Sequence, residues 1–134
     1  MVVAVAQRVV IVDPGHSHNS GHHAELNQQL LATGRAAGLA IEAWVDQALP
    51  SSDPALKPVL EGVGYLDPRH WLDLPGNLHL ARRLHSQLQA QVQTITTPVQ
   101  AWIAHSLLPF QLIGLAQLLQ HQPPAVVEIG ILYA

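Results

Sequence analysis

Histidines gather in one short stretch near the N-terminus of this 134-residue chain. Residues 12–27 read VDPGHSHNSGHHAELN and hold four of the nine histidines, which are His16, His18, His22 and His23. Imidazole nitrogens and carboxylate oxygens bind zinc, and the same groups accept protons or form hydrogen bonds with hydroxyls. The stretch also contains Asp13 and Glu25, so its residue types suit either chemistry. Its spacing matches no dense ligand motif such as H-E-x-x-H, and the pattern alone does not select a metal site.

Two glycines in the same stretch, Gly15 and Gly21, indicate tight turns that let the backbone approach a ligand. Their G-x5-G spacing differs from the G-x-G-x-x-G of dinucleotide-binding loops, and there is no Gly-Lys-Ser/Thr for a phosphate-binding loop. Three interpretations stay open from the residues alone. The stretch is a ligand-binding loop, a metal site, or a polar connection with histidines on the surface.

The elements on either side determine where this stretch lies. RVVIVD over 8–13 is a continuous run of mostly β-branched residues, which predicts a strand buried on both faces. Residues 22–38 predict a helix with Asn19 or Ser20 as its N-cap, and residues 39–45 predict a second strand. The apolar stripe of this predicted helix comprises Leu26, Leu30, Thr33 and Ala37.

Ligands of open α/β sheets bind outside the carboxyl ends of the strands, and the loop over 14–21 lies at such an end. The amide groups that begin the following helix would point into the same space. We therefore expect Gly21, His22 and His23 to contact a ligand. His105 ends a later predicted strand, so it lies at the same edge, either lining the cleft or only ending the strand.

The rest of the chain continues the alternation. Residues 46–75 are rich in Pro, Asp, Ser and Gly, which predicts a long loop excursion with one short element around 59–65. The later elements are a helix over 77–93 with Asn77 as its cap, a strand over 98–106, a helix over 107–121 and a strand over 125–134. The pattern predicts one α/β domain over 1–134, a Rossmann-like three-layer sandwich with a mostly parallel sheet. Because the last strand has no closing helix, we expect an incomplete domain, the N-terminal part of a longer protein.

Composition limits the function further. Charged residues make up 11% of the chain, the net charge is −3, and the six Lys and Arg residues form no basic block, which argues against nucleic-acid binding. The absence of cysteine excludes disulfides and thiolate metal sites. No uninterrupted apolar run reaches the roughly 18 residues of a spanning helix, and no signal peptide is recognised, so we expect a cytoplasmic protein.

Two segments, RVVIVDPGHSHNSGHHAELNQQLLATGRAAGLAIEAWV and AWIAHSLLPFQLIGLAQLLQH, resemble the N-terminal domain of GT-B fold glycosyltransferases of the family 4-like group. The resemblance covers most of the chain in layout and is specific over 13–45 and 99–121. It implies an enzyme that transfers a sugar from a nucleotide-sugar donor to an acceptor.

On the same resemblance, this half mainly binds the acceptor, and its first loop approaches the phosphates or the sugar of the donor, with no cofactor. These substrate-binding roles fall to Gly21, His22 and His23, with His105 as a further candidate. A C-terminal Rossmann-like domain would hold the nucleotide and a pair of glutamates in an E-x7-E pattern. No glutamates of this chain are spaced in that way, so we expect the isolated chain to lack efficient transfer.

A second resemblance is carried by VDPGH and PAVVEIG, which are similar to parts of zinc-dependent N-acetylmuramoyl-L-alanine amidases. It implies a hydrolase with His16, Glu25 and His105 as zinc ligands and Glu128 as the base that activates the metal-bound water. The Gly-Gly that follows the histidine in that family is absent here, so this alternative ranks second. A non-catalytic Rossmann-like binding module is the third alternative.

Overall fold

Five strands and three helices make up the part of the chain that the computed structural model describes, residues 7–64 and 73–130. In chain order they are β1 (Arg8–Asp13), α1 (His22–Ala36), β2 (Ala40–Asp46), β3 (Leu56–Leu60), α3 (Leu74–Val92), β4 (Val99–His105), α4 (Pro109–Leu119) and β5 (Val126–Gly130). No helix among these residues is long and apolar enough to cross a membrane.

The strands form one sheet in the order β3-β2-β1-β4-β5, and every neighbouring pair is parallel. The chain moves outward from β1 through β2 to β3, and then returns to the other side of β1 to continue with β4 and β5. The strand order therefore reverses between β1 and β4, which is where doubly wound sheets bind ligands. This arrangement confirms the predicted Rossmann-like α/β fold.

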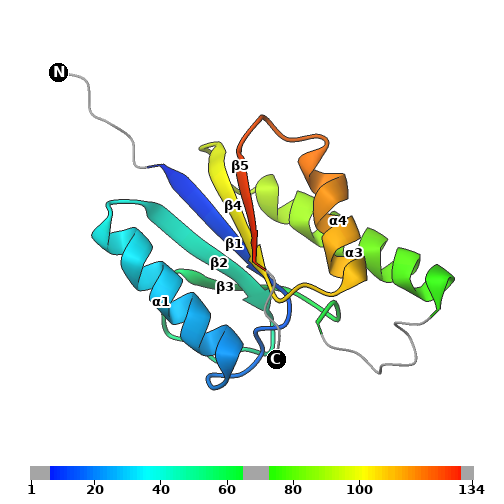
Figure 1. Cartoon of the computed structure of the whole chain (residues 1–134), viewed down its shortest axis with the longest axis horizontal. Helices are drawn as coiled ribbons and strands as arrows, with labels where there is room; N and C mark the ends of the chain where they lie inside the picture. The colour runs from blue at the N-terminus through cyan, green and yellow to red at the C-terminus, as the bar shows by residue number, and fades with distance from the viewer. Residues whose placement is uncertain (1–6, 65–72, 131–134) are drawn as a thin grey trace.

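Helices cover both faces of the sheet, with α1 on one face and α3 and α4 on the other (Figure 1). The larger core lies under α3 and α4 and contains Trp44 of β2 and Trp102 of β4. Their rings meet edge to face at a centroid distance of 5.5 Å. Such pairs contribute about 0.5–1.5 kcal/mol beyond the burial of their area. Both tryptophans are core residues, almost completely buried.

Two helical glycines let neighbouring elements approach closely, one between α1 and the sheet and one between α4 and α3. A Cβ atom added to Gly34 of α1 would lie 2.7 Å from Cγ2 of Ile41 on β2. One added to Gly114 of α4 would lie 2.8 Å from the carbonyl oxygen of Ala81 on α3. Gly34 thus lets α1 pack against the sheet. The first turn of this helix lies next to the end of β1, where His23 contacts Asp13.

The structure corrects the predicted excursion over 46–75, because this segment contains β3. We expected a short element around 59–65, and the strand begins earlier, at Leu56. Pro58 obscures it in the sequence, because proline cannot donate a hydrogen bond to a sheet ladder. Pro58 is exposed, and β3 is an edge strand, where that loss is tolerated.

Both predicted helix caps are wrong. Gly21 caps α1 in place of Asn19 or Ser20, with φ at 94°, a value that glycine adopts without steric strain. Asp73 caps α3, and Asn77 is buried inside that helix, where its side chain donates to the carbonyl oxygen of Asp73. Local sequence favours capping side chains, but the turn that leaves β1 requires a backbone conformation that only glycine adopts readily.

The buried stripe of α1 also differs from the predicted one. The helix buries His23, Asn27, Leu31 and Gly34, whereas Leu26 and Leu30 are half-buried and Thr33 and Ala37 are exposed. Two polar residues thus begin the inward face, and this places them against the carboxyl ends of the strands.

Candidate functional site

Five polar side chains converge at the point where the strand order reverses. They are Asp13 at the end of β1, His16 in the following loop, His23 and Asn27 on α1, and His105 at the end of β4. Each is at most 8% exposed. Buried polar groups are stable only when they are hydrogen-bonded, so the contacts within this cluster determine how it can act.

His23, the most exposed member of the cluster, pairs with the fully buried Asp13. Nδ1 of His23 lies 2.8 Å from Oδ1 and 2.9 Å from Oδ2 of the Asp13 carboxylate. An ionised carboxylate only accepts hydrogen bonds, so the His23 proton in this contact is on Nδ1. In the neutral ring, Nε2 then carries the lone pair. This is the arrangement in which a carboxylate orients a histidine that acts as a general base.

Asn27 connects the remaining members of the cluster. Its Nδ2 donates to Oδ2 of Asp13 at 2.8 Å and lies 2.9 Å from Nδ1 of His16. Its Oδ1 lies 2.7 Å from Nε2 of His105. Since an amide nitrogen donates and an amide oxygen accepts, His16 accepts through Nδ1 and His105 donates through Nε2. One asparagine thereby specifies the proton positions of two histidines.

Burial lowers the pKa of both His16 and His105. The Asp13 carboxylate acts in the opposite direction, and the neighbouring His23 ring lowers both values further. Desolvation is the largest effect, so both rings are neutral at pH 7, in agreement with the proton positions that Asn27 requires.

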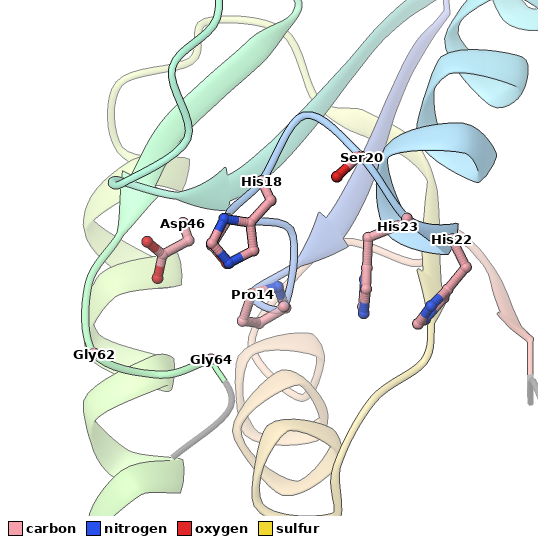
Figure 2. Close-up of a pocket in the computed structure, with 11 residues that line it drawn as sticks. Pro14, His18, Ser20, His22, His23, Asp46, Gly62 and Gly64 are labelled. Carbon is pink, nitrogen blue, oxygen red and sulfur yellow. The ribbon is translucent and has the colours of Figure 1, made fainter. Parts of the chain in front are cut away.

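An open cavity of about 470 Å³ lies beside the cluster. Its lining comes from the loop after β1, the first turn of α1, the end of β2 and the segment after β3. Figure 2 shows His22 and His23 side by side at one wall, with His18 between them and Asp46. The rings of His22 and His23 have centroids 4.1 Å apart. His23 thus joins the cavity to the buried cluster.

The predicted binding residues Gly21, His22 and His23 all line this cavity. His105 lies behind it, in contact with Asn27 and near Asp13, and is absent from the described lining. Gly21, His22 and His23 at the start of α1 therefore line a cavity, whereas His105 belongs to the buried cluster behind it.

The ligand set implied by the amidase resemblance is only partly brought together. His16 and His105 both contact Asn27, but Glu25 is exposed on α1 and Glu128 is exposed on β5. Among residues 7–64 and 73–130, the one group of three or more that could hold a metal ion is Asp13, His23 and His105. Their candidate ligand atoms all lie within 4.8 Å of one another.

Sequence reasoning did not assign roles to Asn27 and Asp46. Asn27 follows His23 by one helical turn, so the two side chains share a face of α1. The predicted apolar stripe lay on a different face, and on that prediction Asn27 would not point toward the sheet. Asp46 is the last residue of β2, which lies beside β1. Because ligands bind at the carboxyl ends of such strands, this position could have identified Asp46 as a candidate from the sequence.

No protein-family model matches the sequence, and comparisons with curated proteins and with solved structures found no match either.

Proposed function

We propose that this chain is the acceptor-side domain of a glycosyltransferase that uses a nucleotide-sugar donor, with His23 as the base that receives the proton of the acceptor hydroxyl. One observation carries the proposal: His23 lines the cavity at the reversal of strand order and is held from behind by the buried carboxylate of Asp13.

The Asp13–His23 pair suits the chemistry of sugar transfer. As the acceptor oxygen bonds to the anomeric carbon, the bond from that carbon to the phosphate oxygen breaks, and the nucleoside diphosphate leaves with the electron pair. The hydroxyl proton passes to Nε2 of His23, and Asp13 stabilises the resulting imidazolium. General-base catalysis of this kind contributes about 10²–10⁴-fold to a rate.

The cavity lining supports a hydroxyl-rich acceptor. Ser20, His18 and Asp46 offer hydrogen-bond donors and acceptors without forming a basic surface. None of the described lining residues is a lysine or arginine, so the pyrophosphate of a donor has no cationic partner among them. The donor-binding groups are proposed to come from a second Rossmann-like domain.

The test is a screen of nucleotide sugars with the full-length gene product, with release of nucleoside diphosphate as the signal. Once an active donor and acceptor pair is found, His23→Gln should lower kcat by about 10²–10⁴-fold. His79→Gln, which alters an exposed histidine on α3, is the matched control and should retain wild-type kcat. Equal kcat for wild type and His23→Gln would contradict the proposal.

A further inference from the structure

We propose that Asp13, His23 and His105 form a binding site for one divalent transition-metal ion, with zinc as the expected occupant. The inference goes beyond the proposed function and does not rest on it. Two imidazoles and one carboxylate are a ligand set that zinc and its neighbours in the first transition row accept.

Three separate elements bring these ligands together. Asp13 ends β1, His23 lies in the first turn of α1, and His105 ends β4. All three are buried, with exposed fractions of 0%, 8% and 3%. Their positions follow from the parallel pairing of β1 with β4 and from the packing of α1 on the sheet, so the group is held by the fold and not by a surface loop.

The spacing of the ligand atoms fits an ion. Tetrahedral zinc binds nitrogen and oxygen at about 2.0–2.2 Å, which places neighbouring ligand atoms about 3.3–3.6 Å apart. With Oδ2 of Asp13 as the carboxylate ligand, Nδ1 of His23 lies 2.9 Å from it and Nε2 of His105 lies 3.5 Å from it. The first separation must lengthen by about 0.4 Å to accommodate the ion, and the second already lies in this range.

Neighbouring groups can hold the ligands in place. Nδ2 of Asn27 donates to Oδ2 of Asp13, and Oγ of Ser106 lies 3.3 Å from Nδ1 of His105. Metal ligands are commonly oriented by such outer contacts. When the ion binds, the His105 proton moves from Nε2 to Nδ1, toward Ser106, and the His23 proton moves from Nδ1 to Nε2. Both rings stay neutral, and the ion replaces their hydrogen bonds with Asn27 and Asp13.

Metal binding has a consequence for the proposed transfer reaction. With its Nδ1 on the ion, His23 carries its proton on Nε2 and can no longer accept one from an acceptor hydroxyl. Bound zinc therefore inhibits that reaction. Zinc binding itself is measured without any substrate, so the two proposals succeed or fail separately.

The binding test uses protein stripped with a chelator and dialysed against buffered Zn²⁺, with metal content measured by elemental analysis. We expect one tightly bound zinc per chain. Asp13→Asn and His105→Gln should each weaken binding by at least about 100-fold, since each removes a direct ligand. The chain has other histidines, so His18→Gln and His22→Gln, which alter cavity residues outside the ligand group, are the matched controls and should bind as wild type does.

Nitrogen-15 NMR of the histidine side chains of the wild-type protein keeps the test valid if a ligand variant fails to fold. Zinc should shift Nδ1 of His23 and Nε2 of His105 and leave the ring nitrogens of His18 unshifted. The proposal is overturned if the wild type binds no zinc, if the two ligand variants bind it as tightly as wild type, or if the shifts fall on His18 instead.

Discussion

The carboxylate of Asp13 lies 2.8 Å from Nδ1 of His23, although one residue ends a strand and the other lies in the first turn of a helix. Asp13 is fully buried, and His23 connects it to the open cavity. This contact is the link between the buried polar cluster and the surface on which a ligand would bind.

Asp13→Asn tests the cluster from its centre. The variant keeps the shape of the side chain but replaces one carboxylate oxygen with an NH₂ group. This NH₂ donor then faces the N–H group of either His23 or Asn27, and two donors cannot form a hydrogen bond with each other. We expect the free energy of unfolding to fall by about 1–3 kcal/mol, the usual effect of an unpaired buried polar group. Urea denaturation measures this change. Glu25→Gln, an exposed acid on α1, should remain within about 0.5 kcal/mol of wild type, and an equal loss in both variants would contradict this account.

Asn27→Ala tests the connecting amide. The variant removes the partner of Nδ1 of His16 and of Nε2 of His105, and one of the donors to Asp13. Each buried polar group left unpaired costs about 1–3 kcal/mol, and two histidine nitrogens lose their partner, so we expect a total loss of about 2–6 kcal/mol. Thermal unfolding monitored by circular dichroism provides the measurement. Gln29→Ala, on the exposed side of the same helix, is the control, and a similar effect of both substitutions would show that Asn27 has no special role.

The lowered pKa values of His16 and His105 predict how stability depends on pH. The unfolded chain binds protons at these histidines near the ordinary pKa of about 6.5, whereas the folded chain resists them. The unfolded state therefore holds more protons below this pH, and the free energy of unfolding should fall as pH drops from about 7 toward 5. The slope contributed by each histidine is at most about 1.4 kcal/mol per pH unit.

Urea denaturation between pH 7.5 and 5, with a chelator present, checks this dependence. His105→Gln removes one of the two titrating groups and should reduce the slope, while His79→Gln, on the exposed side of α3, should preserve it. An unchanged slope in His105→Gln would remove His105 as a cause of the acid sensitivity.

Gly34→Ala tests the close packing of α1 on β2. The added Cβ would lie 2.7 Å from Cγ2 and 2.9 Å from Cδ1 of Ile41, so the helix or the isoleucine must move. Overpacking of this kind costs about 1–3 kcal/mol. A double-mutant cycle with Ile41→Ala measures the interaction, because the smaller side chain removes both contacts. If steric conflict is the cause, Gly34→Ala should be less destabilising in the Ile41→Ala background than in the wild type.

Most elements were predictable because their signals are local. The β-branched run at 8–13 and the apolar run before Asp46 predicted β1 and β2 closely, and the helical spacing around Leu84 predicted α3. β3 was not predicted as a strand, since the segment around it is rich in Pro, Asp and Ser, and only the sheet order reveals that Pro58 lies on an edge strand, where proline is tolerated. Gly21 was missed as a cap because its role depends on the turn that leaves β1.

The sequence by itself determined that a loop rich in histidine and glycine follows a buried strand and precedes a helix, which is enough to place it at the ligand-binding edge of a parallel sheet. Only the tertiary structure decided which histidines act together. His23 turns inward to Asp13, whereas its neighbour His22 is exposed. His105 reaches Asn27 across 78 positions of the chain. That contact depends on the pairing of β4 with β1 and on the rotation of α1, and neither leaves a local pattern in the residues involved.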